Sequence, residues 1–210
     1  MKQMYSIEAK DLSQKEKYFL LLGGIGPRPI AFVSTISKDG IPNLAPFSFF
    51  NAFGSNPPVV IFSPATTTDP KKPHKDTYTN LIETKECVVQ MVSYEMAERM
   101  NLCAQDLEAG INEFEISGFT ELASDIVKPP RVKESPYQME CKLLEMKSIG
   151  DGAGSANLAI CEVLKFHVDE SVFKPDTTRI DPRKIDLIGR NGEYYYTRAS
   201  GEAIFEMKRV

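Results

Sequence analysis

The sequence predicts a mainly β domain with a few flanking helices. Seven or so short runs of apolar and β-branched residues follow one another along the chain and are separated by turn signals. The clearest turns are Asp39-Gly40 and Asn191-Gly192, pairs that favour tight hairpins. Because helical patterns are few, this rhythm is typical of a β-barrel, although a β-sandwich gives nearly the same pattern. The strand pattern alone leaves both architectures open.

The size and composition of the chain fit one globular domain. It has 210 residues, of which 42% are hydrophobic and 26% are charged, close to the average for folded proteins. No linker, internal repeat or low-complexity segment divides it. We therefore expect residues 1–210 to fold as a single domain with a substantial core.

The charge pattern narrows the classes of partner. The net charge is −4, and Lys and Arg do not cluster, which argues against a nucleic-acid surface. Nowhere do 18 apolar residues run together, and the N-terminal segment lacks the apolar stretch of a signal peptide. We therefore expect a cytoplasmic protein with a small-molecule partner and no contact with nucleic acid or membrane.

The four cysteines give no sign of a metal site or a disulfide framework. They are far apart in the sequence, form no C-x-x-C pair, and are accompanied by only two histidines. We expect buried structural thiols and no bound metal. The cysteines are Cys87, Cys103, Cys141 and Cys161.

The first half of the chain predicts a helix followed by strands. Residues 11–22 are expected to be helical, with Ser13 and Glu16 forming a capping box and two glycines ending the helix. Residues 28–37 form the first strand of a hairpin. The return segment 41–53 carries two prolines, so we expect an irregular strand and loop there.

The middle of the chain alternates short helices with strands. A buried strand follows Pro58, and a polar loop then runs to Asp76. Thr77 is expected to cap a short helix, and Ser93 a second one that ends near residue 104.

Two longer strands follow in the second half. Residues 87–92 form a strand of their own, and the segments 138–149 and 157–170 form a hairpin. Residues 105–137 carry few periodic signals.

Several common catalytic motifs are absent. The glycines at 23–26 and 150–154 complete neither G-x-G-x-x-G nor a Walker loop, which argues against a Rossmann or P-loop enzyme. With no G-x-S-x-G and only two histidines, a serine hydrolase is also disfavoured. The sequence therefore favours neither a nucleotide-binding loop of these kinds nor hydrolysis by a catalytic serine.

A group of hydroxyls, amides and bases set among aromatic residues suits flavin mononucleotide (FMN). The flavin ring needs apolar walls with a few hydrogen bonds at its edge, whereas the phosphate needs cations and N–H donors, preferably at a helix N-terminus. The segment Lys75-Asp76-Thr77 opens a predicted helix and meets the second need. The other members of the group are Arg28, Ser34, Thr35, Asn43, Ser48, Asn51 and Asn80.

Three blocks of the sequence resemble the flavin reductase-like family, in particular the branch that contains flavoredoxin and nitrilotriacetate monooxygenase component B. The first block is GPRPIAFVSTISKDGIPNLAPFSFFNAFGSNPPVVIFS at 26–63, and the second is KDTYTNLIETKECVVQMV at 75–92. The third comprises YQMECKLLEM at 137–146 and ICEVLKFHVDE at 160–170. With NEFEISGFT at 112–120, the resemblance extends over most of the chain.

The resemblance implies a homodimer of FMN-binding split β-barrels, each with a flavin near the subunit interface. The segment from Asn43 to Asn51 matches the family stretch that lines the flavin. Backbone and walls would come from Ala45, Pro46, Phe47 and Phe49, and an edge hydrogen bond from Ser48.

The same resemblance implies roles for residues elsewhere in the chain. Residues Lys75, Thr77 and Asn80 match the phosphate-binding stretch, with Asp76 between them. The pocket residues of the first strand are Arg28, Ser34 and Thr35. His167 matches a recurring position on a late strand, where it would approach the flavin or its nicotinamide partner as a catalytic residue.

The resemblance leaves two functions open. The first is NAD(P)H-dependent reduction of FMN, as in the reductase component of a two-component flavin monooxygenase, in which the protein contributes positioning and electrostatics. The alternative is a flavoredoxin-type electron carrier that does not oxidise NAD(P)H itself. The partners would be a nicotinamide donor and a monooxygenase or another redox protein as acceptor.

Overall fold

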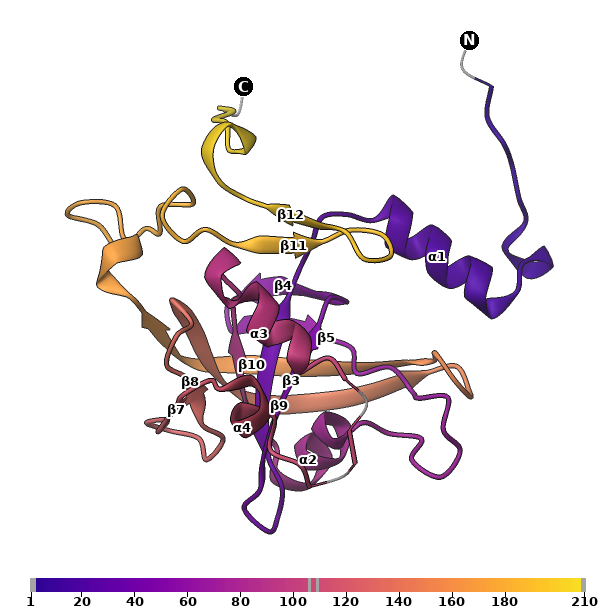
Figure 1. Cartoon of the computed structure of the whole chain (residues 1–210), viewed down its shortest axis with the longest axis horizontal. Helices are drawn as coiled ribbons and strands as arrows, with labels where there is room; N and C mark the ends of the chain where they lie inside the picture. The colour runs from indigo at the N-terminus through magenta and orange to yellow at the C-terminus, as the bar shows by residue number, and fades with distance from the viewer. Residues whose placement is uncertain (1–2, 106, 109, 209–210) are drawn as a thin grey trace.

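The computed structural model describes residues 3–105, 107–108 and 110–208, which form a mainly β fold with a few helices around it (Figure 1). The strands are β1 (Arg28–Pro29), β2 (Ala31–Ile36), β3 (Pro42–Phe47), β4 (Phe50–Ser55), β5 (Pro58–Phe62), β6 (Glu86–Gln90), β7 (Glu121–Leu122), β8 (Arg131–Val132), β9 (Tyr137–Ile149), β10 (Ala156–Val168), β11 (Ile188–Arg190) and β12 (Tyr196–Arg198). The α-helices are α1 (Gln14–Gly24), α2 (Asp76–Thr84), α3 (Ala97–Leu102) and α4 (Glu113–Ser117). The predicted fold class is confirmed.

The order of strands in the main sheet decides between a barrel and a sandwich. Seven antiparallel strands follow the order β3-β2-β6-β9-β10-β5-β4, so β3 and β4 are its two edges. Only two residues link Phe47 at the end of β3 to Phe50 at the start of β4, a connection that spans at most about 11 Å. A flat sheet of this width would separate its edges by roughly 29 Å. The sheet must therefore curl until its edges approach, as in a barrel.

Strand β2 is buried on both faces, which explains its continuous apolar sequence. Val33 faces a cluster that includes Leu81 of α2. The neighbouring Phe32 faces a second cluster, which includes Met100 of α3 and Phe114 of α4. Because successive side chains of a strand point to opposite faces, each face of β2 meets a different set of helices. The helices thereby cover both sides of the sheet.

The expectation of an irregular strand and loop at 41–53 holds only for the second half, where residues 48–49 link two strands and the pairing of β4 is irregular after Ala52. It was wrong for the first half. Pro42 and Pro46 lie in a regular strand, β3, which pairs with β2 over six positions. The N–H of Leu44, between the two prolines, points away from β2 and donates to Glu113. By alternation the two prolines share this outward orientation, so neither interrupts the ladder of hydrogen bonds. Prolines are compatible with β3 because it is an edge strand.

The three predicted helix starts have different outcomes. Ser93 precedes a short 3-10 helix, Tyr94–Met96, without a side-chain cap, and α3 follows it directly. The capping box of Ser13 and Glu16 is formed, and α1 runs from Gln14 to Gly24. The prediction that Thr77 caps α2 was wrong, because the N-cap residue is Lys75. Thr77 lies in the first turn and is buried, and its hydroxyl accepts a hydrogen bond from Asn43 instead.

The predicted hairpins are confirmed. Residue Gly40 has a φ of 84° in the turn between β2 and β3, and the turn at Asn191-Gly192 joins β11 to β12. The long strands β9 and β10 pair along almost their whole length. Within residues 105–137, α4, β7 and β8 were not predicted, because none exceeds five residues.

The cysteines meet the expectation for structural thiols. All four are free and buried, and Cys87, Cys141 and Cys161 belong to the same apolar cluster. Burial, together with the neighbouring thiols, raises the pKa of Cys87. Among the described residues, no helix has the length and hydropathy that crossing a bilayer requires.

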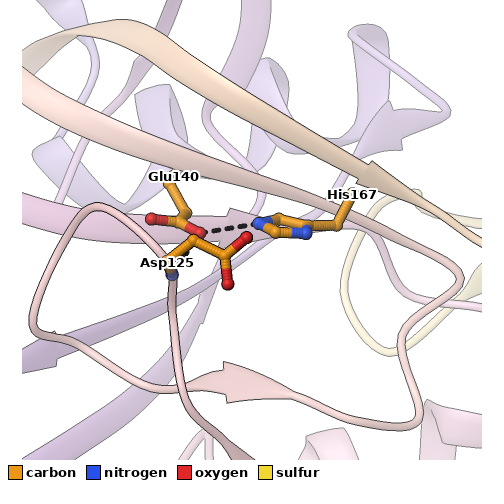
Figure 2. A group of neighbouring side chains, drawn as sticks. All are labelled: Asp125, Glu140 and His167. Carbon is orange, nitrogen blue, oxygen red and sulfur yellow. Dashed lines mark hydrogen bonds and ion pairs between the residues drawn. The ribbon is translucent and has the colours of Figure 1, made fainter.

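A buried carboxylate attaches the segment before β8 to the β9–β10 hairpin. Glu140 of β9 is fully buried, and its two oxygens accept hydrogen bonds from the N–H groups of Asp125, Ile126 and Val127 at 2.6–2.9 Å. His167 of β10 approaches the same carboxylate at 2.6 Å (Figure 2). Burial alone would raise the pKa of Glu140, but the hydrogen bonds outweigh it and lower the pKa to about 2.

This shift predicts an acid-labile contribution to stability. The pKa of Glu140 is about 2 in the folded protein against an ordinary 4.5, so the contribution is complete above about pH 4.5 and is lost as the pH falls toward 2. Its size is about 3 kcal/mol. In urea unfolding, Glu140→Gln is expected to lose about this much at pH 7, and the difference from wild type should shrink between about pH 5 and 2.

The matched control is Glu145→Gln, an exposed carboxylate on the same strand. It is expected to change stability by less than about 0.5 kcal/mol. A stability difference between wild type and Glu140→Gln that stays constant across the acid range would contradict the assignment.

Candidate functional site

A cavity lies between the edge strand β3 and the start of α2. Its volume is about 490 Å³, within the usual range for small-molecule sites. Residues of two loops, at 67–72 and at 103–105 with 107–108, form its remaining walls together with α4. The residues predicted from the sequence that line it are Asn43, Ala45, Pro46, Phe47, Lys75, Asp76 and Thr77.

A buried hydrogen-bond network holds α2 against β2 and β3 beneath this cavity. The side-chain amide of Asn43 donates to the hydroxyls of Thr77, at 2.9 Å, and Thr35, at 3.3 Å. Asn80 of α2 donates to the same Thr35 hydroxyl at 3.0 Å. All four residues are buried. Of the predicted site residues, Thr35 and Asn80 therefore support the cavity without lining it, whereas Asn43 and Thr77 do both.

The start of α2 offers backbone donors to the cavity. Its N-cap residue Lys75 makes no side-chain cap, and its carbonyl accepts the N–H of Tyr78. The donors that this helix can offer to a ligand are therefore the N–H groups of Asp76 and Thr77. Lys72 lies nearby, with its ammonium 2.9 Å from Asp76 and 3.3 Å from the carbonyl of Leu107. Lys72 thus links the two loops that flank the cavity.

The wall opposite α2 is largely apolar. Ala45 and Pro46 of β3 are half-buried at the cavity surface. The ring of Phe47 packs against Phe62 in the core, with centroids 5.4 Å apart, and is only 7% exposed. Phe47 therefore contributes mainly to the core and only a small surface to the cavity.

Glu113 lines the cavity but was not among the predicted site residues. It is the first residue of α4 and is buried, and its carboxylate accepts the N–H of Leu44 at 2.9 Å. Burial raises the pKa of this carboxyl, and the nearby charge of Asp76 adds to the effect. The only sequence signal was its position in the matched segment 112–120, because α4 is too short to produce a periodic pattern.

Arg28 and Ser48 lie away from the cavity. The Arg28 guanidinium is 5% exposed and donates to the carbonyls of Leu22, Ile25 and Asn191, which joins the end of α1 to the β11–β12 turn. The Ser48 hydroxyl accepts from Arg28 at 3.4 Å. Arg28 thus has a structural role that accounts for its burial.

Three further predicted residues are also outside the cavity lining. Ser34 points to the other face of β2, where its hydroxyl donates to the carbonyl of Pro130. Phe49 is 37% exposed, 5.9 Å from the Arg28 guanidinium. Asn51 is exposed on β4, and its side chain accepts the N–H of the following residue.

His167 lies at a second cavity that shares no lining residue with the first. The nitrogen that meets Glu140 is Nε2, and the ring is 17% exposed. The structure of the single chain therefore does not bring His167 together with the residues predicted to bind flavin.

The cluster of Asp125, Glu140 and His167 has ligand atoms within 4.8 Å of one another, which raises the question of a metal (Figure 2). Each Glu140 oxygen already accepts two hydrogen bonds, and one Asp125 oxygen lies 2.5 Å from the Lys165 ammonium. A cation would have to displace these partners beside a fixed positive charge. The cluster is better described as an internally neutralised ion network.

Comparisons with known proteins agree with this architecture. The family model "Flavin reductase like domain" matches residues 24–198. An uncharacterized protein of Aquifex aeolicus (strain VF5) is 41% identical over 185 residues, covering 88% of this chain and 91% of the relative.

Two solved structures have the same fold. Nitrilotriacetate monooxygenase component B from Bacillus cereus has a TM-score of 0.91 at 32% identity, covering 99% of this chain and 100% of the other. Flavoredoxin of Desulfovibrio vulgaris (Miyazaki F) has a TM-score of 0.72 at 21% identity, covering 97% of both chains. The family model over residues 24–198 and the 41% identity to the Aquifex aeolicus protein establish that the chain belongs to the flavin reductase-like family.

Proposed function

We propose that the chain binds FMN in the cavity between β3 and α2, with the phosphate at the start of α2 and the ring along the β3 wall. The observation that carries this proposal is the meeting of three features in one cavity: an uncapped helix N-terminus, the base Lys75 beside it, and the apolar surface of Ala45 and Pro46. Helix N-termini and lysines are common phosphate ligands.

The charges around the cavity are compatible with this ligand only if the phosphate lies at the helix end. Four carboxylates line the cavity against two lysines. Lys72 already neutralises Asp76, and the raised pKa of Glu113 reduces the cost of bringing an anion near it. The helix N-terminus adds a partial positive charge at Lys75, so this corner is where a dianion is best stabilised.

We propose further that the protein is a cytoplasmic NAD(P)H:FMN oxidoreductase, the reductase component of a two-component monooxygenase. When bound, the flavin supplies the two-electron chemistry. The residues of this chain bind and orient it, and β3 and the flanking loops restrict water around the ring. The relative that supports this proposal is nitrilotriacetate monooxygenase component B, at 32% identity. The flavoredoxin of Desulfovibrio vulgaris, at 21% sequence identity, supports only the fold.

The proposed activity predicts direct oxidation of a nicotinamide. The purified protein, loaded with FMN, is expected to lose its flavin absorbance in a single fast phase when mixed anaerobically with NADH or NADPH in a stopped-flow instrument. Failure to take up FMN at all would overturn the flavin site. Uptake without reduction by either nucleotide would instead support the electron-carrier alternative.

We also propose that the chain forms a homodimer through α1. This helix buries only Leu22, while Tyr18, Phe19, Leu20 and Leu21 are 42–55% exposed. Figure 1 shows α1 standing outside the main sheet, beside the β11–β12 hairpin. A helix with this much exposed apolar surface is stabilised if a second copy covers it.

Sedimentation equilibrium tests the dimer. The expected mass is twice the chain mass of 23.5 kDa. The double variant Leu20→Glu with Leu21→Glu should shift the protein to monomer, whereas Lys17→Glu on the same helix should not. A monomeric wild-type protein at micromolar concentration would refute the proposal.

A further inference from the structure

The second cavity, at the end of the β9–β10 hairpin, has the properties of an anion site. Its volume is about 460 Å³, and it is separate from the cavity at α2. Its lining combines residues of β8 and the following turn with the start of β9 and the end of β10. The charged or titratable side chains among them are Arg131, Lys133, His167 and Asp169.

The Arg131 guanidinium is held in position and still has donors to offer. Its Nε and one terminal nitrogen donate to the carbonyl of Ala123, and the other terminal nitrogen donates to Gln138. These bonds take three of its five N–H groups. The side chain is only 13% exposed, and a terminal nitrogen lies 3.9 Å from the Asp125 carboxylate, which Lys165 approaches more closely, at 2.5 Å. The fold therefore fixes the orientation of Arg131.

Lys133 is a second cation at this cavity, and no other described residue pairs with it. It is exposed, and its ammonium makes no hydrogen bond or ion pair with any described residue. Lys165, by contrast, is paired with Asp125 on the neighbouring surface. Lys133 is therefore available to a ligand that enters the cavity.

His167 presents its other nitrogen on the side away from Glu140. Figure 2 shows Nε2 directed at the Glu140 carboxylate and Nδ1 on the opposite edge of the ring. This nitrogen can donate a hydrogen bond to a ligand in the tautomer that carries the proton on Nδ1. Asp169 is the one carboxylate among the lining residues, and it accepts the N–H of Ser171. Positive charge therefore exceeds negative charge in this lining.

We propose that this cavity binds a phosphate dianion, either free or as the phosphomonoester of a small molecule. A positioned guanidinium suits two phosphate oxygens, an ammonium supplies charge to the third, and the imidazole offers a further hydrogen bond. Arg131, which the fold holds in place, and the exposed Lys133 together carry as many positive charges as the ligand has negative ones. The proposal does not depend on flavin binding, since the two cavities have no residue in common.

Isothermal titration with inorganic phosphate at constant ionic strength tests the site. Saturable binding by wild-type protein is expected, and Lys133→Gln should weaken it about tenfold because one charged hydrogen bond is lost. Two controls should leave the affinity unchanged: Lys128→Gln and Lys142→Gln, both exposed lysines that line neither cavity. Absence of saturable binding, or equal weakening by Lys128→Gln and Lys133→Gln, would overturn the proposal.

The source of the phosphate is distinguished by a second pair of titrations. AMP and adenosine share the nucleoside, but only AMP carries a phosphomonoester. If AMP binds more tightly than inorganic phosphate and Lys133→Gln weakens AMP binding, the ligand is an organic phosphate. If AMP and inorganic phosphate bind equally, the ligand is the free anion. Adenosine binding as tightly as AMP would contradict recognition of phosphate at this cavity.

Discussion

The hydrogen bonds of the buried Asn43 amide are the interaction on which the rest of the site depends. Its N–H groups donate to the hydroxyls of Thr35 on β2 and Thr77 on α2. The side-chain amide of Asn80, also on α2, donates to the Thr35 hydroxyl as well. Each such bond contributes about 1 kcal/mol, but loss of one partner would leave another buried polar group unsatisfied. The network therefore fixes the position of the start of α2 relative to β3. The cavity lies between these two elements, so its shape depends on that position.

The edge position of β3 gives the site its second constraint. An edge strand has one row of backbone groups that no other strand satisfies. Here Glu113 accepts one of them, from Leu44, and the prolines at 42 and 46 remove two further donors. The remaining surface is apolar and lies against the cavity, which suits a flat aromatic ligand better than another strand.

Much of the fold was predictable from the sequence because its signals are local. The capping box at Ser13, the turn at Gly40 and the long β9–β10 hairpin each depend on residues close together in the chain. The regular pairing of β3 was not predictable, since the tolerance for proline comes from its place at the sheet edge. Closure into a barrel followed only from the strand order.

The candidate site was predicted in part for a similar reason. Two of the residues chosen by type, Asn43 and Lys75, line the cavity, but residue type could not separate ligand contacts from structural bonds. Arg28 and Ser34 have the chemistry of pocket residues, yet backbone carbonyls distant in the sequence take their donors. Glu113 was missed because its role depends on contact between α4 and β3.

The most direct test of a flavin in the β3–α2 cavity compares the affinities of FMN and riboflavin, which differ only in the phosphate. Lys75→Gln is expected to weaken FMN about tenfold or more and to leave riboflavin unchanged, because a charged contact to phosphate contributes about 1.5–3 kcal/mol. Lys71→Gln, an exposed lysine of the neighbouring loop outside the cavity lining, should affect neither ligand. Equal losses for FMN and riboflavin, or no loss for either, would contradict the placement of the phosphate at the start of α2.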